Sequence, residues 1–174
     1  KHKISKNYAK KNGMKQTDVL DMWARNASEA SEMGTYIHLY CECYLNQTDF
    51  QEKSIKTEKE IALKEIAKNA CDEMLARYEF IEAEKIVFSE KIGIAGTIDL
   101  LMLDRKTNKL MILDWKTNKK IDTSGFRGKK AIEPIKHLDD CNANKYILQM
   151  STYKHIIESE GYFSDISDYG MALI

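Results

Sequence analysis

Residues 96–116 read GTIDLLMLDRKTNKLMILDWK, and this stretch decides the fold. Two runs rich in Ile and Leu, Gly96 to Leu103 and Lys109 to Lys116, are typical of strands. The polar residues 104–108 between them predict a hairpin-type loop. A similar run from Glu84 to Lys91 comes before them, so the sequence predicts an antiparallel meander of three strands.

Helical patterns stand on both sides of this meander. Apolar residues recur at three-to-four spacing in segments that begin at Thr17, span about Ser28–Leu45, span about Glu58–Tyr78, and span about Asn144–Glu160 before Gly161. Residues 169–174 predict one more strand. The order of elements indicates a mixed α/β fold. Because the chain has 174 residues, we expect a single domain over residues 1–174.

Two polar segments flank these elements. Residues 1–15 hold six Lys and no acid, which predicts a basic arm of the kind that is often disordered. Residues 117–144 lack periodicity and predict a long loop, and such loops in compact domains are usually functional or disordered. Lys and Arg total 27, as do Asp and Glu, but the basic residues gather in the arm and in residues 116–130. The zero net charge therefore excludes only a protein that binds nucleic acid by bulk charge.

The four cysteines form no C-x-x-C motif, which argues against a zinc ribbon or a redox motif. We expect free thiols in a reducing compartment. No apolar run approaches the ~20 residues that span a bilayer, and no signal peptide is visible. These observations predict an intracellular protein without a membrane partner.

Two aspartates interrupt the apolar strands. Asp99 lies inside one strand, Asp114 ends another, and Lys116 shares a face with Asp114. A hairpin can bring the two carboxylates together, where they repel each other and a buried charge is costly. A divalent cation removes both problems, and oxygen ligands suit Mg²⁺ or Mn²⁺. Alone, D-x-K also fits an ordinary salt bridge; with G-x-x-D at hairpin distance, a metal site is favoured.

Two helical pairs fit the same site. Gly34 and His38 lie one turn apart on one helix face, and Gln149 and Tyr153 share a face of the last predicted helix. Taken singly, each pair also fits ordinary structural residues. The ordered set G-x-x-x-H, G-x-x-D, D-x-K and Q-x-x-x-Y, from Gly34 to Tyr153, resembles the RecB-type branch of the PD-(D/E)XK nuclease superfamily.

The quoted segments carry the same likeness. Residues 112–117 look like the corresponding strand of RecB-like and mitochondrial genome-maintenance exonucleases. Residues 138–142 and 146–153 look like small stand-alone nucleases of phages and large DNA viruses. The resemblance implies a restriction-endonuclease-like core, in which helices flank a central mixed β-sheet, with an N-terminal helical region. It also implies that residues 117–144 form a loop at the active site.

The resemblance implies roles for matched positions. The metal ligands would be His38, Asp99, Asp114 and the backbone carbonyl of Trp115, with Lys116 as the catalytic lysine beside Asp99 and Asp114. Gln149 and Tyr153 would hold the DNA backbone and orient Lys116. Separately from the resemblance, the basic residues Lys119 and Lys120 flank the proposed site on the long loop, where they fit either a solvated face or a track of phosphate contacts. Glu90 matches a less constant acid on the preceding strand. No iron–sulfur cluster is expected, because no Cys follows Cys141 to supply its last ligands.

The predicted function is a Mg²⁺- or Mn²⁺-dependent deoxyribonuclease, an exonuclease that acts on single strands or DNA ends in replication, recombination or repair. It would work in the cytoplasm or nucleoid, or in the host cell if phage- or virus-encoded, with DNA and a helicase or recombination partner. One alternative is a catalytically silent nucleic-acid-binding module of the same fold. Another is the nuclease domain of a larger helicase–nuclease, because the chain starts at Lys1 rather than Met. A restriction-type endonuclease is less favoured.

Overall fold

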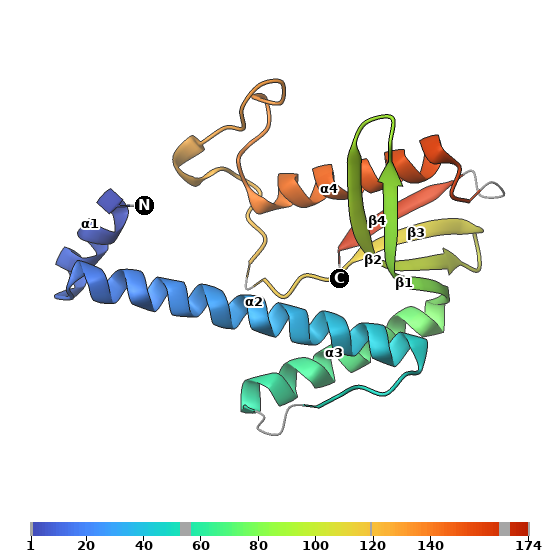
Figure 1. Ribbon diagram of the computed structural model, residues 1–174, viewed down its shortest axis with the longest axis horizontal. Coiled ribbons are helices and arrows are strands. Elements are labelled where there is room, and N and C mark those ends of the chain that lie inside the picture. Colours follow the sequence, from blue (N-terminus) through green and yellow to red (C-terminus); the bar gives the residue numbers. More distant parts are fainter. Residues whose placement is uncertain (1, 53–56, 119, 164–167, 174) are drawn as a thin grey trace. The chain divides into compact units, whose positions relative to one another are not determined.

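The computed structural model describes residues 2–52, 57–118, 120–163 and 168–173 (Figure 1). These residues form a mixed α/β structure, as the order of predicted elements indicated. The helices are α1 (His2–Asn12), α2 (Gln16–Asn46), α3 (Glu58–Arg77), the short 3₁₀ helix η1 (Phe126–Gly128) and α4 (Asn142–Glu160). The strands are β1 (Tyr78–Ser89), β2 (Ile94–Asp104), β3 (Lys109–Asp114) and β4 (Tyr169–Leu173). The chain divides into two compact units, residues 1–37 and residues 38–174.

The first unit contains α1 and the first part of α2. The basic arm is helical rather than disordered over residues 2–12. The Tyr8 ring packs edge-on against Trp23, with centroids 5.6 Å apart, and Gln16 Nε2 donates a hydrogen bond of 2.8 Å to Ser5 Oγ. The two helices expected from Thr17 and over Ser28–Leu45 are one continuous helix, α2. Residues 24–32, in the middle of this helix, are exposed and have no apolar stripe that would predict a helix. No proline interrupts them, so the helix continues through them.

The second unit is built on a four-stranded sheet in the order β1-β2-β3-β4. The predicted meander is confirmed, because β1 pairs antiparallel with β2 and β2 with β3. The predicted last strand is also present as β4, which pairs parallel with β3; Ile174 lies outside the described residues. A parallel pair needs a crossover connection, and here α4 lies within it.

The core of this unit lies between the sheet and α4 (Figure 1). Apolar side chains from three strands and from α4 form one buried cluster: Val87, Ile98, Leu101, Leu110, Ile112, Met150, Ile156 and Ile157. The edge strand β1 is covered locally by Tyr162, whose hydroxyl accepts a hydrogen bond of 2.9 Å from Phe88 N and donates one of 3.2 Å to Phe88 O. No helix in the described part of the chain is long and apolar enough to cross a membrane.

Local signals account for where the elements begin and end. Thr57 and Glu60 form a capping box at the start of α3, in which each side chain bonds the backbone N–H of the other. Gly161 ends α4 in the left-handed conformation, with φ of 67°, at the position the sequence predicted. In the β2–β3 turn, Asp104 Oδ1 accepts hydrogen bonds from Lys106 N at 2.8 Å and Thr107 N at 3.2 Å.

The long loop after β3 is irregular apart from η1, but ion pairs tie it to the start of α4. Lys129 and Lys145 both pair with Asp140, at 2.5 Å and 2.8 Å, and Lys130 pairs with Asp139 at 2.5 Å. The two ammonium groups beside Asp140 lower the pKa of that carboxyl to about 2. The loop lysines Lys129 and Lys130 therefore have carboxylate partners within the chain.

Gly96 on β2 leaves space that an aromatic ring occupies. A Cβ added at Gly96 would lie 2.5 Å from Tyr153 Cε1 and 2.9 Å from its hydroxyl oxygen. Tyr153 is half-buried against the core cluster, so its ring has little freedom to retreat. A side chain at position 96 would displace the ring of Tyr153.

We expect Gly96→Ala to lower the free energy of unfolding by about 1–3 kcal/mol, because overpacking forces side chains from their preferred rotamers. Tyr153→Leu removes the ring, so the double variant should lose less than the sum of the two single variants. Urea unfolding followed by circular dichroism measures all four members of this cycle. Additive losses would contradict the proposed contact.

Candidate metal centre

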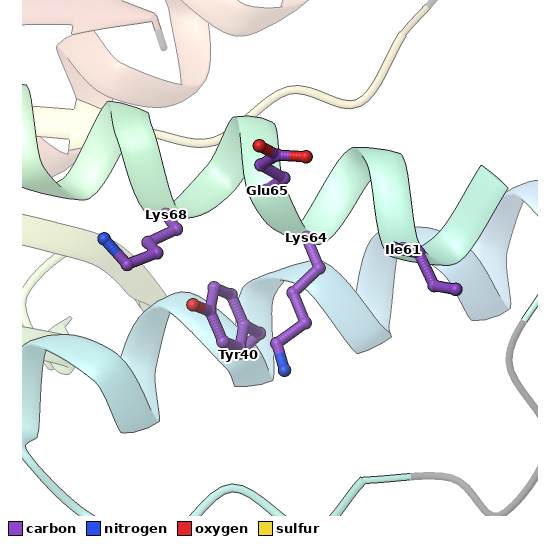
Figure 2. A pocket seen from close by; sticks show the side chains of 5 residues that line it. All are labelled: Tyr40, Ile61, Lys64, Glu65 and Lys68. Carbon is purple, nitrogen blue, oxygen red and sulfur yellow. The ribbon is translucent and has the colours of Figure 1, made fainter. Parts of the chain in front are cut away.

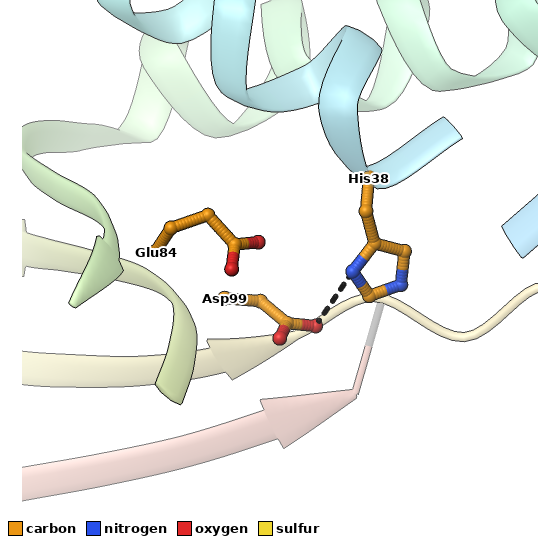
Figure 3. A group of neighbouring side chains, drawn as sticks. All are labelled: His38, Glu84 and Asp99. Carbon is orange, nitrogen blue, oxygen red and sulfur yellow. Dashed lines mark ion pairs between the residues drawn. The ribbon is translucent and has the colours of Figure 1, made fainter. Parts of the chain in front are cut away.

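Three titratable side chains converge beside the sheet (Figure 3). His38 comes from α2, Glu84 from β1 and Asp99 from β2, and one ligand atom from each lies within 4.8 Å of the others. His38 Nδ1 lies 3.5 Å from Asp99 Oδ2. An imidazole with two carboxylates is a donor set for a divalent cation.

The strand register explains why Glu84 and Asp99 meet. Ala83 pairs with Leu100 and Lys85 with Ile98, so Glu84 faces Asp99 across the ladder. Like charges directly opposite each other on antiparallel strands are destabilising. Glu84 also has a φ of 51°, in the left-handed region that favours glycine, which adds backbone strain.

Asp114 adds a third carboxylate to the row that Glu84 and Asp99 form across β1 and β2. Leu100 pairs with Leu113, so Asp99 and Asp114 come next at the end of the β2–β3 ladder, as the hairpin argument predicted. The Trp115 N–H donates a hydrogen bond of 2.9 Å to Asp99 Oδ2. The three carboxylates of β1, β2 and β3 therefore follow one another across the sheet.

Asp114 is 3 % exposed, and it forms an ion pair with Lys116. The Lys116 ammonium contacts the buried Oδ2 as an ion pair, and this oxygen accepts no hydrogen bond from the residues that the structure describes. Within the described residues, the Lys116 ammonium is the positive charge that compensates this buried carboxylate.

Burial and mutual repulsion disfavour ionisation within the cluster. Burial raises the pKa of Asp99 above its ordinary value, the Asp114 charge raises it further, and His38 counteracts both. Burial also raises the pKa of Glu84, and the Asp99 charge adds to this. The cluster is short of positive charge, which a bound cation would supply.

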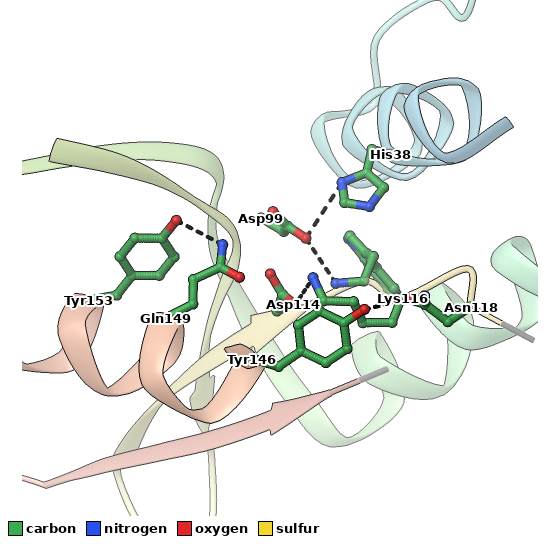
Figure 4. A network of polar contacts seen from close by, with 9 residues as sticks. His38, Asp99, Asp114, Lys116, Asn118, Tyr146, Gln149 and Tyr153 are labelled. Carbon is green, nitrogen blue, oxygen red and sulfur yellow. Dashed lines mark hydrogen bonds and ion pairs between the residues drawn. The ribbon is translucent and has the colours of Figure 1, made fainter. Parts of the chain in front are cut away.

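Helix α4 lines the other side of Lys116 (Figure 4). Gln149 Nε2 donates a hydrogen bond of 3.0 Å to the Tyr153 hydroxyl, so these two predicted residues share a helix face and contact each other. The residue that faces the lysine is Tyr146, whose ring centre lies 4.6 Å from Lys116 Nζ. Its hydroxyl donates a hydrogen bond of 2.7 Å to Asn118 Oδ1.

Several predicted residues lie away from this cluster. Glu90 is exposed in the turn that follows β1, and Glu84 is the acid that β1 brings to Asp99 instead. Lys120 is exposed and pairs with Asp122 at 2.6 Å, whereas Lys119 lies outside the described residues. Trp115 is buried and contributes its N–H, while its carbonyl as a metal ligand remains a prediction.

Glu84 and Tyr146 were missed as site residues. The β1–β2 turn ends at Gly93, which has a φ of 65°, and Ser89 pairs with Ile94. A turn placed at Gly93 from the sequence would have put Glu84 opposite Asp99. Tyr146 lies three residues before Gln149, a spacing that places both on one side of a helix.

A hollow of about 230 Å³ lies between α2 and α3 (Figure 2). It is lined by Tyr40, Ile61, Lys64, Glu65 and Lys68. Lys64 stacks over Tyr40 at 5.0 Å and pairs with Glu52, and Lys68 pairs with Asp72 at 2.6 Å. Both ammonium groups already have carboxylate partners, so the candidate site is the cluster at the sheet.

Comparison of the chain with models of protein families, with curated proteins and with solved structures gave no match. The nuclease resemblance therefore stays a prediction from the motifs.

We expect Asp99→Asn to stabilise the metal-free protein increasingly as pH rises above about 4. The folded pKa of Asp99 is raised above 3.8, so its protonated form favours folding, and this contribution is lost as pH rises through the folded pKa. Asparagine has no proton to lose. Thermal unfolding in EDTA from pH 4 to pH 8 measures the difference.

Asp104 is the matched control on the same strand. Hydrogen bonds from the backbone N–H groups of Lys106 and Thr107 lower its pKa, so its ionised form favours folding and contributes above pH 4. Asp104→Asn should therefore lower the melting temperature in that range. If both substitutions changed the melting temperature in the same direction, the assignment of charge repulsion to Asp99 would be contradicted.

Proposed function

We propose that the chain is a metal-dependent deoxyribonuclease with a restriction-endonuclease-like core. Its reaction would be hydrolysis of DNA phosphodiester bonds, as an exonuclease on single strands or DNA ends. The observation that supports it best is the row of Glu84, Asp99 and Asp114, with His38 beside Asp99 and Lys116 beside Asp114. A set of acids that repel one another beside a lysine suits chemistry on a phosphate.

The residues fit Mg²⁺ or Mn²⁺. The closest ligand atoms come from two carboxylates and one imidazole, and the buried Asp114 Oδ2 lacks a hydrogen-bond partner within the described ranges. His38, Glu84, Asp99 and Asp114 would hold the cation. When bound, such a cation activates water and neutralises charge on a phosphate.

The chain's own groups divide the remaining tasks. The Lys116 ammonium, whose side chain is 15 % exposed, would donate to a phosphate oxygen and stabilise the negative charge that develops during hydrolysis. Gln149 and Tyr153 would hold the DNA backbone through their amide and hydroxyl groups. The loop cations Lys129, Lys130 and Lys145 already have aspartate partners, so we infer that DNA is bound locally at the site.

Asp114→Asn and Lys116→Ala should each reduce cleavage of labelled single- and double-stranded DNA by roughly 100-fold or more, because each removes a group that acts in the transition state. EDTA should abolish cleavage, and Mn²⁺ or Mg²⁺ should restore it. End-labelled and internally labelled strands separate exonuclease from endonuclease products.

Two control variants lie at the opposite end of the same strands. Lys109 on β3 pairs with Asp168 at 3.1 Å, and Asp104 ends β2 in the turn. Lys109→Ala and Asp104→Asn should leave cleavage within about twofold when each is assayed below its own melting temperature. Full activity in Asp114→Asn or Lys116→Ala would falsify the proposal. DNA binding that ignores metal, without cleavage, would favour a silent binding module.

A further inference from the structure

An inference that rests on the proposed nuclease function concerns Tyr146. We propose that Tyr146 is a positioning residue, whose ring holds the Lys116 ammonium in place against Asp114. It would act through Lys116 and would contact neither DNA nor the cation.

The ammonium is held from two sides (Figure 4). Asp114 forms an ion pair with it, and the centre of the Tyr146 ring lies 4.6 Å from Nζ. A cation within about 6 Å of a ring centroid is attracted by the negative face of the ring. A lysine side chain is otherwise a flexible stem with a point charge at its end, so a second contact restricts where that charge lies.

Asn118 fixes the ring in turn. The Tyr146 hydroxyl donates to Asn118 Oδ1 at 2.7 Å, and Asn118 lies two residues after Lys116 in the chain. The helix α4 and the start of the loop are thereby joined across the lysine. A change of χ1 that swings the ring away from Nζ would move the hydroxyl and break this hydrogen bond.

The Tyr146 ring also gives Lys116 a contact that would not be shared with a bound cation. Asp114 is a proposed metal ligand, so its carboxylate would be shared between the cation and Lys116. The Tyr146 ring is uncharged and does not compete for the cation. It therefore gives Lys116 an anchor that is independent of metal occupancy.

Replacement of Tyr146 by a graded series separates ring electronics from ring shape. Phenylalanine keeps the ring face and loses the Asn118 bond, leucine removes the face, and mono-, di- and trifluorophenylalanine weaken its negative charge with little change in size. We expect Tyr146→Leu to lower kcat by about 2-fold to 30-fold with little change in KM, the span of an exposed to a desolvated cation–π contact. The kcat of Tyr146→Phe should lie between the values for wild type and Tyr146→Leu, and kcat should decrease stepwise with each fluorine added to the phenylalanine ring.

A second measurement does not depend on activity. The ring should shift the ε-methylene protons of Lys116 upfield in the NMR spectrum, and this shift should persist in Tyr146→Phe and vanish in Tyr146→Leu. Melting temperatures of all variants confirm that each is folded at the assay temperature. Equal kcat across the fluorinated series, or equal ε-methylene shifts in wild type and Tyr146→Leu, would overturn the proposal. If the wild-type protein cleaves no DNA, the nuclease proposal fails, and the ring-current shift alone decides whether Tyr146 positions Lys116.

Discussion

Repulsion among three carboxylates in one row of the sheet is the constraint on which the candidate site depends. Glu84, Asp99 and Asp114 occupy consecutive positions across β1, β2 and β3 because the strand register places them there. Such a row costs stability unless positive charge is nearby. His38 lies at one carboxylate and Lys116 at another, and the row retains one buried oxygen without a hydrogen bond among the described residues. The loss of stability therefore falls on residues that the proposed function would use.

One hydrogen bond keeps the row in order at the end of β3. Beyond the pair Leu100 and Leu113 the β2–β3 ladder stops, and the Asp99 side chain accepts the Trp115 N–H in place of a strand partner. This bond fixes the backbone between Asp114 and Lys116. The position of Lys116 is thereby linked to Asp99 as well as to Asp114 and Tyr146.

Local patterns predicted most of the second unit. The meander, the presence of a last strand and the end of α4 at Gly161 each follow from apolar periodicity or from a single cap residue, whereas the parallel pairing of that strand was not predicted. Glu84 did not follow, because its place depends on where the β1–β2 turn lies, and a shift of one residue would have turned it to the other face. The continuity of α2 was missed because its exposed middle has helix-forming residues but no apolar stripe. Tyr146 depends on a tertiary contact, which periodicity does not reveal.

The parallel pairing of β4 with β3 has a consequence for the sequence separation of the contacts around the site. The strands β1, β2 and β3 follow one another with short turns, so their contacts are local in the chain and inexpensive in loop-closure entropy. Strand β4 reaches β3 only after the long loop and α4, so its contacts are far more distant in sequence. Distant contacts form slowly. The three-carboxylate row is therefore built from contacts of short sequence separation, whereas the face that α4 brings to Lys116 depends on contacts of long sequence separation.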